Sequence, residues 1–181
     1  FAVSLEQDPD PFIRANATWL LILYAKYSDV LIHALNDENA IVRRKAANSL
    51  GYVYRIMVDE ENRASEELLR RFEDDDIYVR YFALNSFSYV KKDLTHEEFS
   101  LVLKLLNEKN SAMRKKTYET LARLKLKGSL NSLEEHEILI EIQKHLLNET
   151  DENVLANAYY FLSLLNFEKY KSIDTSPLEE F

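Results

Sequence analysis

The chain has 181 residues, a formal net charge of −8 at pH 7, 46% hydrophobic and 30% charged residues, a balance typical of a folded globular protein. It contains only two glycines and three prolines, too few of the usual turn residues for a β-protein with many tight turns, so the composition favours helices. Cysteine is absent, which excludes disulfides, thiolate metal ligands and thiol nucleophiles and agrees with a reducing compartment.

Charge and hydropathy narrow the classes of function further. The longest apolar run, 19–25, is far shorter than the roughly 20 residues that span a bilayer, and the first residues lack the pattern of a signal peptide. We therefore expect a cytoplasmic protein without a membrane helix. The acidic balance opposes the basic footprint that duplex-binding proteins use to displace counterions.

Internal repetition is the strongest signal in the sequence. An apolar residue followed by arginine recurs at Arg14, Arg43, Arg80 and Arg114, with steps of 29, 37 and 34 residues. Such a period is typical of repeated helical hairpins. Five related segments carry the pattern: 11–17, 40–46, 77–83, 111–117 and 153–158.

Each segment predicts the second helix of a hairpin, here named the B helix. Apolar residues at steps of four, four and three form one stripe on a helix, as in Val42, Ala46, Leu50 and Val53. A second amphipathic run precedes each later segment and predicts the first helix, here named the A helix. The predicted A-helix stripes are 30–35, 65–72, 99–106 and 138–147.

Capping patterns predict helix ends. Thr95 with Glu98 and Ser132 with Glu135 fit the capping box, in which a hydroxyl and a carboxylate satisfy free amides at a helix start. Gly128 lies where a left-handed C-terminal cap would end a B helix.

The stretch from Asp37 through Val42-Arg43 and Ala46 to Ser49-Leu50-Gly51 resembles the HEAT repeat, particularly the short form also found in phycobilisome-lyase-like proteins. The resemblance extends from about Leu5 to Phe167. It implies an all-α fold, a right-handed α-α superhelix (solenoid) of about five HEAT-like hairpins, in which each hairpin buries its stripe against the next.

The resemblance also implies a ladder between a turn acid and the B-helix arginine of neighbouring repeats. Asp8 with Arg14, Asp37 with Arg43 and Asp74 with Arg80 share one separation, and Glu108 with Arg114 is the charge-equivalent variant. Leu155 replaces the arginine in the fifth repeat, as expected of a terminal unit.

One repeat array is expected over 1–167. Its first repeat is incomplete, because 1–7 is too short for an A helix, so we expect the chain to be part of a longer protein. Its fifth repeat acts as a cap, and 168–181, which loses the periodicity, is expected to be a C-terminal tail.

No catalytic pattern is evident. The four histidines form no metalloprotease motif, and no nucleophile elbow or phosphate-binding loop is present. Glu137, Glu141, His145 and Glu149 follow one helix face and could present ligands to a metal, but the solvated face of an A helix is the favoured interpretation. We expect no catalytic residue, metal or cofactor.

In HEAT-like stacks the B helices line the concave side, so the resemblance places certain B-helix positions in a groove. These positions carry aromatic, asparagine and basic residues, which are typical of contact surfaces. The predicted partner-binding residues are Trp19, Arg44, Lys45, Asn48, Tyr52, Tyr81, Asn85, Tyr89, Lys115 and Arg123.

The sequence therefore predicts a protein-protein interaction scaffold that binds a peptide or protein, an acidic segment among the candidates. Two alternatives stay open. The basic residues of 114–127, with interleaved tyrosines, could serve a nucleic-acid-binding helical-repeat protein, and the family resemblance allows a lyase-like protein that handles a chromophore.

Overall fold

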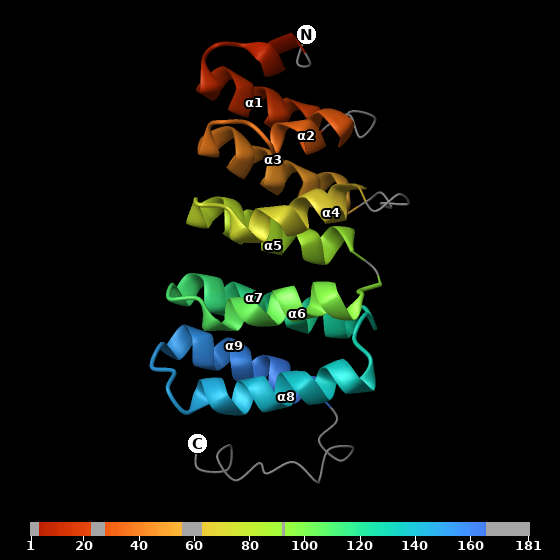
Figure 1. Ribbon diagram of the computed structural model, residues 1–181, viewed down its shortest axis with the longest axis vertical. Helices are drawn as coiled ribbons and strands as arrows, with labels where there is room; N and C mark the ends of the chain where they lie inside the picture. Colours follow the sequence, from red (N-terminus) through yellow and green to blue (C-terminus); the bar gives the residue numbers. More distant parts are fainter. Residues whose placement is uncertain (1–3, 23–27, 56–62, 92, 166–181) are drawn as a thin grey trace. The chain divides into compact units, whose positions relative to one another are not determined.

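A computed structural model describes residues 4–22, 28–55, 63–91 and 93–165 (Figure 1). All regular elements in these ranges are helices, so the expected fold class, an all-α array of helical hairpins, is confirmed. Two compact units divide the chain, Phe1–Lys91 and Lys92–Phe181, and each is described by itself. The predicted tail 168–181 lies outside the described residues.

The first unit stacks its B helices in one layer and its A helices beside them (Figure 1). Helix α3 packs between α1 and α5, while α2 packs on α3 and α4 packs on α5. A short 3₁₀ turn, η1, precedes α1, in place of a full A helix. The elements are η1 Ser4–Gln7, α1 Pro11–Leu21, α2 Ser28–Ala34, α3 Ala40–Val53, α4 Arg63–Arg70, η3 Arg71–Glu73 and α5 Ile77–Val90.

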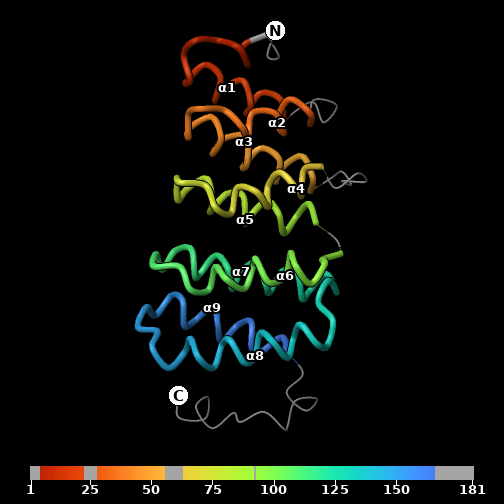
Figure 2. The backbone as a smooth tube through the Cα atoms, in the orientation of Figure 1, coloured from red at the N-terminus to blue at the C-terminus, as the bar shows by residue number. Residues whose placement is uncertain are grey.

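The second unit contains two hairpins, whose course is visible in the tube of Figure 2. The B helices α7 and α9 pack together, and the A helix α6 packs on α7 and α8. The elements are α6 His96–Lys104, η4 Leu105–Asn107, α7 Ser111–Leu126, α8 Ser132–Leu146 and α9 Glu152–Ser163.

The predicted apolar stripes form the cores of both units. Leu50 and Phe87 are fully buried in the first unit, where Phe87 meets Phe72 edge to face at 5.4 Å. Phe99 and Leu121 are fully buried in the second. Each A helix begins two to six residues before its predicted stripe, and α6 and α8 begin at capping boxes formed by Thr95 and Asn131.

The five B helices share the same type of N-cap. In each of the five an Asp or Asn is the N-cap and accepts a backbone amide of the first turn, which satisfies a donor that the helix cannot. The N-caps are Asp10, Asn39, Asp76, Asn110 and Asp151. In the first four B helices this repeated start places an arginine four residues later, at the same position in each hairpin.

One predicted capping box is present and the other is shifted. Thr95 and Glu98 cap α6 reciprocally. For α8 the cap is Asn131 with Glu134, one residue before the predicted Ser132 with Glu135. The carboxamide of Asn131 accepts the amides of both Leu133 and Glu134, so the helix starts one residue earlier.

Gly128 ends α7 as predicted. Its φ is +74°, the left-handed region that favours glycine. Ser129 donates its amide to the Leu124 carbonyl and Gly128 donates to Lys125, both at 3.0 Å, which is the Schellman arrangement.

Candidate partner-binding face

The B-helix layer of the first unit exposes large aromatic side chains. Trp19 of α1 and Tyr52 of α3 remain 45% and 40% exposed, although both lie on helices whose opposite faces are buried. Their rings meet edge to face, with centroids 5.5 Å apart and an interplanar angle of 85°. Aromatic pairs favour this geometry, so adjacent repeats present one joined aromatic surface.

Two cations extend this surface along α3. The ammonium of Lys45 lies 5.6 Å from the centre of the Trp19 ring. The guanidinium of Arg55 lies over Tyr52 at 4.8 Å and over Tyr89 of α5 at 4.3 Å. We name these five residues, Lys45, Trp19, Tyr52, Arg55 and Tyr89, the aromatic–cation row.

The charges of the row lack counterions within the described part of the chain. Neither Lys45 nor Arg55 forms an ion pair with a described carboxylate. Cations held over aromatic faces are attracted by the ring quadrupole, which fixes their positions without neutralising them. The row therefore combines exposed apolar area with uncompensated positive charge.

Arg44 behaves differently from Lys45, its neighbour. Its guanidinium makes a two-pronged ion pair with Asp76, the N-cap of α5, and also lies 4.7 Å from the centre of the Tyr78 ring. The hydrogen bond from Arg44 lowers the pKa of Asp76. Arg44 thus joins two repeats, and its charge is already balanced.

The other predicted contact residues fall into two groups. Tyr81 packs edge to face on Phe82 at 5.5 Å and, like Asn48 and Asn85, is partly exposed on the first unit. Lys115 and Arg123 lie on α7 of the second unit, outside the aromatic–cation row.

At least four of the six basic residues in 114–127 form ion pairs with acidic residues. Arg114 pairs with Glu149, Lys115 and Lys116 pair with Glu119, and Lys125 pairs with Glu135. These pairs remove much of the positive field that phosphate binding requires.

Arginines at the turns of the hairpins tie consecutive repeats together. Arg43 donates from Nε and Nη2 to the Asp74 carboxylate of the next turn, both at 2.8 Å, and from Nη1 to the carbonyls of Asp37 and Glu38 in its own turn, both at 2.9 Å. Arg14 reaches Asp37 in the same way. We name the pairs Arg14–Asp37, Arg43–Asp74 and Arg114–Glu149 the inter-repeat ladder.

The ladder stabilises its acids in the ionised state. Partial burial opposes ionisation of Asp74, but the hydrogen bonds from Arg43 and from the Asp76 amide outweigh it, so the pKa of Asp74 lies below its ordinary value. Asp37 has its pKa lowered by the equivalent contacts, and the hydrogen bond from Arg114 lowers the pKa of Glu149.

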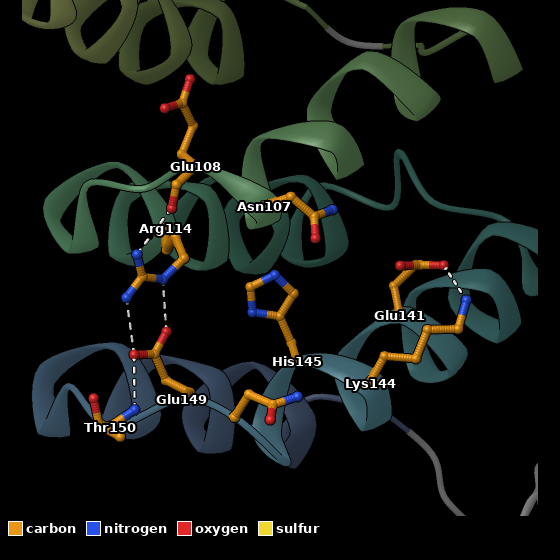
Figure 3. A pocket seen from close by; sticks show the side chains of 9 residues that line it. Asn107, Glu108, Arg114, Glu141, Lys144, His145, Glu149 and Thr150 are labelled. Carbon is orange, nitrogen blue, oxygen red and sulfur yellow. Dashed lines mark hydrogen bonds and ion pairs between the residues drawn. The ribbon is translucent and has the colours of Figure 1, made fainter.

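A polar pocket of about 420 Å³ opens beside one rung of the ladder in the second unit (Figure 3). In Figure 3 the His145 ring is drawn between the Arg114–Glu149 pair and the Glu141–Lys144 pair. Burial lowers the pKa of His145. A pocket of about 390 Å³ occupies the corresponding place beside Arg43 in the first unit. A pocket beside the ladder arginine is therefore found in both units.

Two of the acidic residues considered as metal ligands form ion pairs with basic side chains. Glu149 is held by Arg114 and Glu141 by Lys144, and the described residues contain no group of three or more histidine, aspartate and glutamate side chains arranged to hold a metal ion. None of the described helices is both long and apolar enough to cross a bilayer.

The sequence analysis did not identify the places of three residues in this geometry. Arg55 follows Tyr52 by three residues, a spacing that continues the same helix face, and this signal was available. Tyr78 lies at the start of α5, outside the B-helix positions that the resemblance places in the groove. Glu149 was assigned to a helix face, whereas it lies in the turn after α8.

Comparison with known proteins agrees with this geometry. A family model described as HEAT repeats matches residues 2–88. This segment belongs to the HEAT-repeat family. The resemblance drawn from the sequence is therefore confirmed there. No curated protein matches the chain.

Solved helical-repeat structures share the fold of these HEAT repeats and of the hairpins that follow. The complex of CpcE and CpcF of phycocyanin lyase from Nostoc sp. PCC7120 is 23% identical, with a TM-score of 0.68 over 93% of this chain and 65% of that chain. A designed armadillo repeat protein in complex with the peptide (KR)4 is 17% identical, with a TM-score of 0.68 over 91% and 80%. A computationally designed armadillo repeat protein for modular peptide recognition is 16% identical, with a TM-score of 0.65 over 91% and 81%.

Proposed function

We propose that the chain is a polypeptide-binding scaffold without catalytic activity, and that the aromatic–cation row holds an acidic segment of its partner. The observation that carries the proposal is the exposed Trp19–Tyr52 pair on adjacent B helices, joined to cations that no described carboxylate neutralises. Large aromatic side chains and arginine dominate the energetics of protein contacts.

Charge complementarity favours an acidic occupant. Lys45 and Arg55 would pair with carboxylates, while the ring faces and edges of Trp19 and Tyr52 would cover apolar side chains between them. The fold shared with a designed armadillo repeat protein in complex with a peptide supports a peptide as the partner. Its peptide (KR)4 is basic, so the acidic preference rests on the row of this chain alone.

A nucleic acid is the less favoured partner. The chain carries a net charge of −8, and the basic residues of α7 already pair with Glu119, Glu135 and Glu149. A phosphate-dominated contact would weaken by several orders of magnitude between 50 and 200 mM salt. A contact centred on Trp19 and Tyr52 should lose far less, because desolvated aromatic surface is insensitive to screening.

The test is an array of synthetic 12-residue peptides in acidic, neutral and basic series, each containing the same apolar residues, with oligonucleotides as a further arm. We expect the full chain to bind the acidic series. Trp19→Ala and Tyr52→Ala should each weaken that binding at least tenfold. Tyr160→Ala is the matched control, because Tyr160 is 53% exposed on α9 and lies outside the row.

Two results would overturn the proposal. One is peptide binding that survives both Trp19→Ala and Tyr52→Ala unchanged. The other is binding of oligonucleotides, with a steep salt dependence, in preference to all three peptide series.

A further inference from the structure

Arg55 differs in its surroundings from the arginines of the inter-repeat ladder. It directly follows Tyr54, the C-cap of α3, and its side chain is exposed. Its guanidinium lies 4.8 Å from the ring centre of Tyr52 and 4.3 Å from that of Tyr89. Two rings from neighbouring helices, α3 and α5, therefore hold one cation.

The hydrogen-bonding edge of Arg55 is left available by this arrangement. Arg43 and Arg114 each donate from all three nitrogens, to two carbonyls and one carboxylate. Within the described ranges, Arg55 makes no hydrogen bond and no ion pair, only its two ring contacts. A guanidinium is a planar fork of five donors that matches a carboxylate with two parallel bonds.

We infer that Arg55 is an oxyanion receptor that binds a side-chain carboxylate of the partner's acidic segment. The inference rests on the proposed function and names the chemical group that Arg55 binds. Ring contacts hold the guanidinium in place before binding, so less side-chain entropy is lost when the carboxylate docks. Tyr89 contributes as one wall of the receptor, together with Tyr52.

A carboxylate fits the site better than a phosphate. Besides Arg55 the row contains one further uncompensated cation, Lys45 over Trp19, whereas phosphate sites commonly gather several arginines. The net charge of −8 also repels a dianionic phosphate more strongly than a monoanionic carboxylate. The adjoining Trp19–Tyr52 pair provides apolar contact area, so the recognised element is an acidic residue next to apolar ones.

The test is a double-mutant cycle with the tightest-binding acidic peptide of the array. Each Glu or Asp of the peptide is changed in turn to Gln or Asn, and each peptide is measured against the wild-type chain, Arg55→Gln and Arg55→Lys. We expect one peptide position to couple with Arg55→Gln by at least tenfold. Arg55→Lys should restore no more than part of the affinity, because an ammonium keeps the charge but loses the fork.

A spectroscopic measurement separates recognition from a folding defect. The Nε–H resonance of Arg55, assigned by its loss in Arg55→Lys, should shift when the acidic peptide is added. The chemical shift of this resonance should not change when the peptide with Gln at the coupled position is added to the same bound fraction.

The outcomes distinguish the two proposals. Coupling below twofold at all peptide positions, while Trp19→Ala still abolishes binding, would overturn the assignment of Arg55 as a carboxylate receptor. The proposed polypeptide-binding function would then still stand. Binding unaffected by Trp19→Ala and Tyr52→Ala would overturn the scaffold. A phosphoserine peptide that binds at least tenfold more tightly than its Glu counterpart would overturn the assignment to a carboxylate.

Discussion

Arg43 and Asp74 lie 31 residues apart in the sequence and are joined by two hydrogen bonds of 2.8 Å. The Asp74 side chain is 3% exposed, and the same carboxylate accepts the Asp76 amide. One acid thus fixes the turn that starts α5 and binds it to the preceding repeat.

Replacing Arg43 with Gln should lower the free energy of unfolding by about 2–3 kcal/mol. The nearly buried Asp74 would lose its two hydrogen bonds from a guanidinium and would keep the Arg71 cation at 3.8 Å. Urea titration followed by circular dichroism measures this loss. Arg70→Gln is the control: Arg70 pairs with Glu67 from a largely exposed position, so its loss should stay below about 1 kcal/mol. Equal losses in the two variants would contradict a structural role of the ladder.

The ladder also predicts a loss of stability in acid. Asp37, Asp74 and Glu149 have folded-state pKa values below their ordinary values of 3.8, 3.8 and 4.5. Depressed pKa values stabilise the fold above those ordinary values, and the contribution disappears as the pH falls through the folded-state values. Urea midpoints should therefore fall steeply below about pH 4.

Arg43→Gln and Arg114→Gln serve as controls for the acid titration. Each variant lacks the hydrogen bond that holds one acid ionised, so its stability should depend less on pH in this range. Parallel curves for the variants and the wild type would show that other groups cause the acid effect.

Gly51 of α3 lies at a close approach to Ser86 of α5. A Cβ on Gly51 would lie 2.4 Å from Ser86 Oγ and 3.2 Å from Ser86 Cα. Gly51→Ala should therefore destabilise the first unit by about 1–3 kcal/mol, as overpacking does, even though alanine has the higher helix propensity. Gly51→Ala combined with Ser86→Gly should recover part of the loss. A stabilised Gly51→Ala variant would mean that the helices separate without cost.

Gly128 tests the end of α7 in the second unit. Its φ of +74° strains any residue with a Cβ, although no atom lies within 4 Å of the position a Cβ would take. Gly128→Ala should lower stability by about 1 kcal/mol and Gly128→Asn by less, because asparagine tolerates this conformation. Thermal unfolding compares the two, and equal effects of Ala and Asn would point to lost flexibility instead of backbone strain.

The HEAT resemblance implied a ladder between turn acids and B-helix arginines of neighbouring repeats, but not its full set of partners. The arginines and turn acids repeat at fixed separations, so their recurrence is readable along the chain. Glu149 was misplaced because its role depends on where α8 ends, at Leu146. That end depends on local capping and packing, which a run of helix-favouring residues such as 141–149 does not define.

The sequence by itself determined the helices, their pairing into hairpins and the face that each buries, because periodicity, N-caps and Gly128 act over a few residues. Trp19, Lys45, Tyr52 and Tyr89 were predicted as contact residues because the HEAT resemblance places their B-helix positions in a groove. Only the tertiary structure decided that Arg55 lies between Tyr52 and Tyr89 while Arg44 is paired with Asp76. Both outcomes depend on the spacing and register of α3 against α5, which Gly51 and Ser86 set by close contact, and no pattern within one helix encodes that distance.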